Sequence, residues 1–129
     1  ADILTEGKDV TIIANGHLVW EALEAYNSLT KIGISAEVIN FATIKPLDIS
    51  TLLKSVEKTG RVVTAEEHQK NGGLGDSVAQ ALALNKPCPM EMVGVNDSFG
   101  ESGKPDQLMK KYGLDSSAIV DAVKSVLKR

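Results

Sequence analysis

Acidic and histidine side chains follow directly on a β-branched run in the middle of the chain. Glu66, Glu67 and His68 come after the run 61–65, and a glycine-rich stretch at 69–76 comes next. A histidine can act as a general base when a carboxylate orients it, because its ordinary pKa lies near neutrality. The sequence therefore offers His68 as a base oriented by Glu66. The simpler alternative, which we favour, is that His68 hydrogen-bonds a loop carbonyl and holds the turn.

These three side chains do not form a metal site by themselves. Neighbouring residues of a strand point to opposite faces of a sheet, so Glu66, Glu67 and His68 cannot all converge on one ion. We therefore predict no metal ligands among them, and no catalytic constellation assembles from the sequence alone.

The glycines Gly72, Gly73 and Gly75 precede a predicted helix. A helix N-terminus carries partial positive charge, and glycines let backbone amides approach an anion. The spacing matches neither the dinucleotide fingerprint nor a P-loop. A structural turn is the favoured interpretation, followed by an interface loop and then by a bound phosphate.

A second polar group lies in a predicted loop at 96–104. It contains Asp97, Ser98, Glu101, Ser102 and Lys104. Neither serine has the G-x-S-x-G surround of a nucleophile elbow, so a solvated loop is expected. We take Glu66, Glu67, His68, Gly72, Gly73, Gly75, Ser102 and Lys104 together as a candidate interface or anion-contact loop.

The elements that position these residues alternate between strand and helix patterns. Strands are predicted at 10–14, 36–41, 61–65 and 90–95, and helices at 17–31, from 49, at about 74–84, from 105 and from 118. Asn15 or Gly16 is expected to cap the first helix, and Asp115 or Ser116 the last. A short strand at 3–4 is expected to run antiparallel to the first. The pattern predicts a three-layer α/β/α sandwich with a mixed, mostly parallel sheet of about five strands. The carboxyl ends of parallel strands meet at one edge, where open α/β sheets bind ligands.

Composition limits the classes of function. The chain has 129 residues, 43% hydrophobic and 24% charged, which fits one domain and includes no membrane-spanning run. A net charge of −3 argues against a nucleic-acid partner. The chain opens at Ala1 without an initiator methionine, so we expect a piece of a longer chain or subunit.

Three residues outside these motifs also bear on function. Cys88 is expected to be a small buried or loop residue, and His17 to face solvent or contact a loop. The scarcity of aromatic residues draws attention to Trp20. Its exposure would indicate a surface that another domain covers, whereas partial burial against the sheet is the alternative.

Several of these motifs, in this order, resemble the C-terminal domain of transketolase. The matching segments are DVTIIANG at 9–16, IKPLD at 44–48, VTAEEH at 63–68 with GGLG at 72–75, GVNDSFG at 94–100 and SGKP at 102–105. The KPLD and EEH elements are common to the thiamine diphosphate superfamily. The SGKP segment, followed by Leu108, YGL at 112–114 and Asp115, selects transketolase. The NGH turn at 15–17 departs from the usual Thr-Gly-Ser or Thr-Gly-Ala.

The resemblance implies an enzyme of the pentose phosphate pathway that transfers a two-carbon ketol unit between sugar phosphates with thiamine diphosphate and magnesium. The single cysteine, which cannot form an internal disulfide, fits a cytoplasmic location. In that family the cofactor and metal ligands come from the diphosphate-binding and pyrimidine-binding domains. The domain matched here is expected to be non-catalytic, to pack on those two domains and to support assembly of a homodimer.

Other assignments remain open. One is the C-terminal domain of deoxyxylulose phosphate synthase or of a 2-oxoacid dehydrogenase beta subunit. Another is a regulatory module that binds a small anion at the carboxyl edge. An independent enzyme is the weakest alternative.

Overall fold

The computed structural model describes residues 1–42, 46–67, 73–94 and 115–129. The predicted loop at 96–104 and the helix predicted from 105 lie outside these ranges. No helix in the described part of the chain is long and apolar enough to cross a bilayer.

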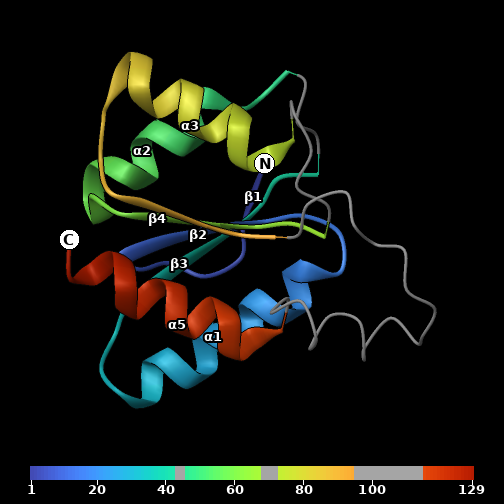
Figure 1. Ribbon diagram of the computed structural model, residues 1–129, viewed down its shortest axis with the longest axis vertical. Helices are drawn as coiled ribbons and strands as arrows, with labels where there is room; N and C mark the ends of the chain where they lie inside the picture. Colours follow the sequence, from blue (N-terminus) through green and yellow to red (C-terminus); the bar gives the residue numbers. More distant parts are fainter. Residues whose placement is uncertain (43–45, 68–72, 95–114) are drawn as a thin grey trace.

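A five-stranded mixed sheet forms the middle layer (Figure 1). The strands lie in the order β1-β3-β2-β4-β5, and all neighbours are parallel except β1 and β3. Their bounds are Asp2–Ile3 for β1, Val10–Ala14 for β2, Ala36–Asn40 for β3, Val62–Ala65 for β4 and Met90–Val93 for β5. The predicted fold class is confirmed, and the last strand ends two residues earlier than expected.

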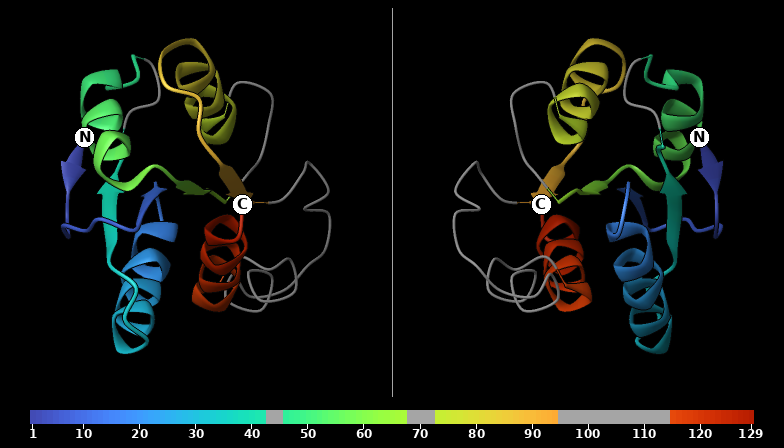
Figure 2. Two further views of the ribbon diagram at one scale, coloured as in Figure 1. Left: turned by 90° about the vertical axis from the view of Figure 1, so that its left-hand side faces the viewer. Right: turned by 90° about the vertical axis from the view of Figure 1, so that its right-hand side faces the viewer.

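Helices cover both faces of the sheet, which gives the three layers seen end-on in Figure 2. On one face lie α1 (Leu18–Lys31) and α5 (Ser116–Leu127), and on the other lie α2 (Ile49–Thr59) and α3 (Leu74–Asn85). Strand β2 is fully buried between them. Because side chains alternate along a strand, Val10 and Ile12 pack in the core under α1 and α5, while Ile13 packs under α2 and α3.

The helix starts differ in how well the sequence predicted them. Asp115 caps α5 as expected, since its Oδ1 accepts a hydrogen bond from the Ala118 amide at 3.2 Å. The predicted cap of α1 at Asn15 or Gly16 is wrong, because the N-cap is His17 and no side chain caps it. Gly16 adopts φ +60°, a left-handed turn that ends the preceding segment before the helix begins.

Strand β1 runs antiparallel to its neighbour as expected, but that neighbour is β3 rather than the first long strand, β2. The chain crosses because Gly7 lies directly against the backbone of β3, where a Cβ would stand 2.3 Å from the carbonyl carbon of Ala36. Thr5 completes the crossing, with its Oγ1 donating to the Ala36 carbonyl at 3.0 Å.

Candidate functional site

The carboxyl edge of the sheet brings together segments that are far apart in sequence. Ala14 at the end of β2 is in register with Ala65 at the end of β4, and Ala65 is in register with Val93 of β5. The residues that follow β2 and β4 are therefore neighbours. This edge is the one at which the sequence predicted a functional site.

Glu66 is turned inward at this edge and fills the N-terminus of α3. Its Oε1 accepts a hydrogen bond from the Leu74 amide at 3.0 Å, and its Oε2 accepts one from the Gly75 amide at 2.6 Å. The residue is only 5% exposed. Two amides that have no partner within the helix are thereby paired, and the carboxylate's charge lies at the positive end of the helix dipole. Both carboxylate oxygens of Glu66 thus bind backbone amides of α3.

Glu67 faces the other way and lies toward His17 on the adjacent segment. The His17 Nε2 and Glu67 Oε1 atoms are 3.9 Å apart, and the side chains are 80% and 34% exposed. The prediction that Glu66 and Glu67 point to opposite faces is confirmed, as is the solvent-facing position of His17. No acidic partner for His17 was predicted from the sequence. The register of β2 with β4 supplies one, although so long and exposed a pair contributes little stability.

The remaining members of the candidate loop divide into two groups. Gly73 is the N-cap of α3, and Gly75 is buried inside its first turn. The other members, His68, Gly72, Ser102 and Lys104, lie outside the described residues. Within the described part of the chain, no group of three or more His, Cys, Asp or Glu side chains is arranged to hold a metal ion.

Cys88 shows no sign of activation. It is a free, partly buried thiol, and burial raises its pKa, although the charge of Lys86 acts in the opposite direction. A raised pKa keeps the sulfur in its unreactive thiol form.

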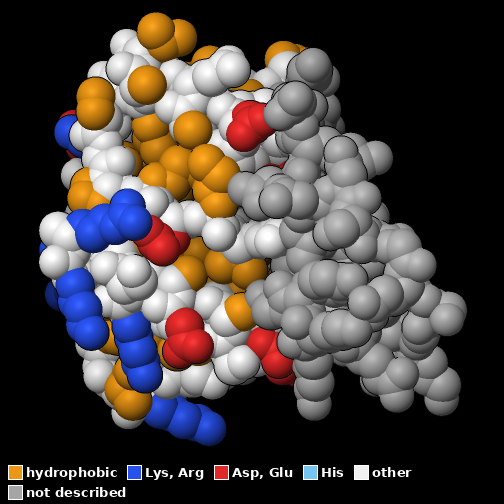
Figure 3. Space-filling model, viewed as in Figure 1, with side chains coloured by type: hydrophobic (Ala, Val, Ile, Leu, Met, Phe, Trp, Pro, Cys, Tyr) orange, Lys and Arg blue, Asp and Glu red, His pale blue; other side chains and the backbone are white. Residues whose placement is uncertain are grey.

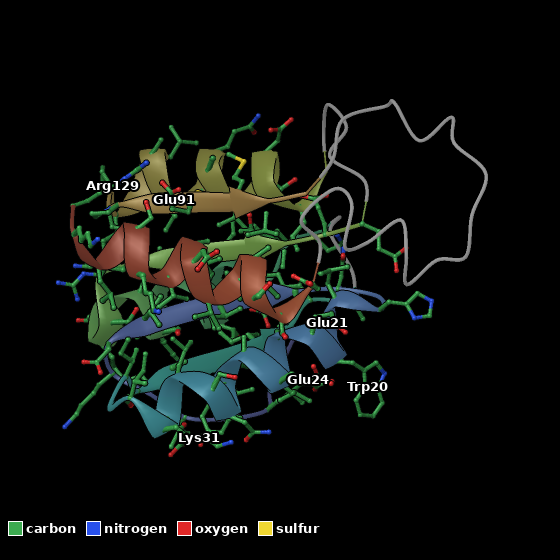
Figure 4. The ribbon with its side chains drawn as sticks, turned by 60° about the horizontal axis from the view of Figure 1, so that its bottom comes forward. Trp20, Glu21, Glu24, Lys31, Glu91 and Arg129 are labelled. Atoms are coloured by element: carbon green, nitrogen blue, oxygen red, sulfur yellow. The ribbon has the colours of Figure 1, made fainter. Side chains whose placement is uncertain are left out.

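Trp20 projects from α1 into solvent, as Figure 4 shows. The residue is 71% exposed, so the alternative of partial burial against the sheet is wrong. It is the sole tryptophan of the chain. Exposure of this tryptophan is what we expected if another domain covers this surface.

Basic side chains gather away from the candidate site. Figure 3 shows Lys and Arg side chains on the left of the view, where the strands begin and α5 ends. Lys31, Lys58 and Lys124 occupy the last turns of α1, α2 and α5. Cations are favoured there because helix C-termini carry partial negative charge.

The fold and this edge define the class of protein. The chain is a three-layer α/β domain with four parallel strands, one antiparallel edge strand and a carboxyl edge at which an internal glutamate fills a helix N-terminus. The family model described as "Transketolase, C-terminal domain" matches residues 1–119. The chain belongs to this family.

Individual relatives agree with that assignment. The chain is 49% identical over 129 residues to a 6-deoxy-6-sulfo-D-fructose transketolase subunit from a Clostridium species. It is 46% identical over 130 residues to a putative transketolase C-terminal section from Methanocaldococcus jannaschii. A solved structure titled as a split-gene transketolase, inactive beta4 tetramer, matches 98% of the chain with a TM-score of 0.94 and 49% identity.

The similarity covers almost all of this chain but less than half of each relative. The chain spans 40% of the length of both the Clostridium and the Methanocaldococcus proteins and 42% of the solved chain. A 1-deoxy-D-xylulose-5-phosphate synthase from Geobacter sulfurreducens is also 40% identical over 128 residues, with 20% of its own length covered.

Proposed function

We propose that this chain is the C-terminal domain of a cytoplasmic transketolase-type enzyme, either as part of one polypeptide or as part of a subunit. The domain packs on the pyrimidine-binding and diphosphate-binding domains, supports assembly of the enzyme and is itself non-catalytic. One observation carries the proposal: a transketolase C-terminal model matches 119 of the 129 residues, while the chain spans only about two fifths of its relatives.

Thiamine diphosphate and magnesium belong, in this proposal, to the other domains. The described residues do not fit either group: no cluster of candidate metal ligands is present among them, and the two amides at the start of α3 that could receive a diphosphate oxygen already bind Glu66. We therefore assign no step of ketol transfer to a side chain of this domain.

The role in assembly is supported by the surface of α1. Trp20 is exposed and Glu24 beside it is exposed as well, whereas Leu18 and Ala22 on the opposite side of the helix are buried. A large aromatic side chain on a polar stripe is typical of an interface anchor. We infer that Trp20 contacts another part of the enzyme, and that the exposed pair of His17 and Glu67 lies at the margin of the same contact.

The sugar substrate is not assigned. Two relatives are named for different sugars, 6-deoxy-6-sulfo-D-fructose in one and apulose 4-phosphate in the other. The carbon skeleton of the donor is therefore expected to depend on the domains that bind the cofactor, and not on this one.

The proposal is tested with the chain alone and with a partner. Calorimetry of the 129-residue chain with thiamine diphosphate and magnesium should give no binding heat, and the chain alone should give no ketol transfer. The chain should form a complex with the part of the Clostridium subunit that it does not match, observed by light scattering. Micromolar cofactor binding or turnover by the chain alone would overturn the non-catalytic assignment, and failure to form the complex would count against the packing role.

A further inference from the structure

The N-terminus of α3 has the features of an anion site, and it is occupied by the protein's own carboxylate. Leu74 and Gly75 are the first two residues of this 12-residue helix, and their amides both donate to Glu66. The preceding N-cap, Gly73, has no side chain with which to cap the helix. Helix N-termini of this kind bind phosphate or carboxylate groups in other proteins through the same backbone amides and the same helix dipole.

The space around the carboxylate is closed on the side of the sheet. A Cβ at Gly75 would lie 2.9 Å from Met92 Sδ, 3.2 Å from Glu66 Oε2 and 3.4 Å from Thr64 Oγ1. Gly75 therefore lets the helix backbone come close enough for its amide to reach Glu66 at 2.6 Å. A methyl group at this position would require the ends of the Met92 and Glu66 side chains to shift.

A buried hydroxyl group faces the same place. Thr64 is fully buried, and its Oγ1 has no hydrogen-bond partner among the described residues. Its distance from the Gly75 position puts it beside the carboxylate that fills the helix end. An unpaired hydroxyl next to two amide donors is a further group that an oxyanion can use.

We propose that the start of α3 is an oxyanion site that the chain fills by itself, with Glu66 in the position of the ligand. The site does not bind an external anion in the unchanged protein. Removing the glutamate side chain opens it to a small carboxylate. Glu66→Ala removes two carbons and two oxygens beyond Cβ, the heavy atoms of acetate, so acetate is the ligand of matching size and charge. Orthophosphate is larger and tetrahedral, and is expected to bind more weakly.

The inference bears on the candidate loop. Sugar phosphates and the cofactor diphosphate are oxyanions, and this helix end is the place at the carboxyl edge where a doubly wound fold would receive them. Glu66 keeps it closed. Any regulatory anion at this edge must therefore be held by groups other than the Leu74 and Gly75 amides.

The test is rescue of Glu66→Ala by acetate, followed by thermal unfolding. The variant should unfold about 8 °C below the unchanged chain in chloride, as expected for a lost buried cap in a domain of this size. Acetate at matched ionic strength should raise its Tm in a saturable way. At ten times its Kd, acetate should raise the folding equilibrium constant about elevenfold. Acetamide, which has the same shape without charge, should have little effect.

Two controls separate a filled site from a general salt effect. Asp48 caps α2 through the Thr51 amide, but its side chain is 39% exposed, so Asp48→Ala should show no acetate-specific rescue. Glu66→Gln keeps the space filled and should also fail to respond. Equal acetate responses in Glu66→Ala and Asp48→Ala would overturn the proposal.

The unchanged chain provides a measurement that does not depend on any variant. Its Leu74 and Gly75 amide resonances should not move when phosphate or acetate is added. Saturable shifts of both resonances would show that the helix end is open to external anions, and would overturn the proposal even if Glu66→Ala failed to fold in chloride. If that variant does fail to fold in chloride, refolding in acetate supports the proposal, and no refolding in acetate contradicts it.

Discussion

Glu37 keeps a negative charge in the interior, on β3 beneath α2. Its side chain is fully buried, whereas its partner Lys58 is 49% exposed, and the two form a close ion pair. Burial by itself raises the pKa of the Glu37 carboxyl. The hydrogen bond and charge of Lys58, together with hydrogen bonds from the Ser55 hydroxyl and the Gly7 amide, outweigh burial and hold the pKa below its usual value. Lys58 is therefore the countercharge of this buried carboxylate, and Ser55 and Gly7 supply further hydrogen bonds to it.

We predict that Lys58→Met lowers the free energy of unfolding by about 2 kcal/mol at pH 7, because it leaves a buried carboxylate without its countercharge. The lowered pKa of Glu37 means that the pair's contribution is present above about pH 4.5 and is lost as the pH falls through the folded pKa. The difference between the variant and the unchanged chain should therefore shrink in acid. Urea unfolding at pH 7 and pH 3.5 measures both values.

Lys54→Met is the matched control for this prediction. Lys54 is exposed one turn earlier on α2, so the same substitution there should cost little at either pH. A loss in Lys58→Met that stays constant from pH 7 to pH 3.5 would mean that lost packing of the lysine stem, and not the charge of Glu37, causes the destabilisation.

Two glutamates cap helices other than the element on which they lie, and they thereby connect the helices with each other and with the sheet. Glu66 at the end of β4 caps α3, and Glu21 of α1 accepts a hydrogen bond from the Ser116 amide at the start of α5, at 2.8 Å. Residues 21 and 116 are 95 positions apart. Sequence rules for helix caps find local acceptors such as Asp115, but they do not find acceptors that come from another element.

The link between α1 and α5 gives a prediction at this scale. Glu21→Ala should destabilise the chain by about 1 kcal/mol, because the first amide of α5 loses its carboxylate acceptor. Glu24→Ala, on the exposed side of the same helix, should change the free energy of unfolding by less than half as much. Denaturant midpoints of the two variants test this, and equal midpoints would show that the hydrogen bond contributes nothing.

Across the whole molecule, the sequence predicted the layers better than the contacts between them. The apolar run at 10–14 predicted a doubly covered strand, because only a strand buried on both faces lacks polar alternation. The neighbour of β1 was not predicted, since it depends on the close approach of Gly7 to the Ala36 backbone. The helical spacing of buried Leu18, Ala22 and Leu29 already places Trp20 on the outer side of α1, a signal that the sequence contained.

The positions of Glu66 and Glu67 at the carboxyl edge were predicted, but the contacts that they make were not. Parallel strands bring Glu66 and Glu67 to the carboxyl edge, and alternation along the strand separates their side chains. That Glu66 reaches the amides of Leu74 and Gly75 depends on the path of the chain between β4 and α3. These hydrogen bonds join residues that are eight and nine positions apart, and the spacing of residues in the sequence does not predict such a contact.

The outer side of α1 gives the prediction that belongs to the assembled molecule. If Trp20 anchors the domain to the rest of the enzyme, Trp20→Ser should weaken binding to the unmatched part of the Clostridium subunit by tenfold or more, as loss of a buried aromatic anchor does. Leu84→Ser is the matched control, because Leu84 is 84% exposed but lies on α3, in the opposite helical layer. The Leu84→Ser variant should bind the same part of the subunit with unchanged affinity.

In the unchanged chain, Trp20 is the sole tryptophan, so its fluorescence reports directly on the contact. Its emission should shift to shorter wavelength as the complex forms. If Leu84→Ser weakens the complex and Trp20→Ser does not, the partner packs against the layer formed by α2 and α3, and α1 faces solvent in the assembled enzyme.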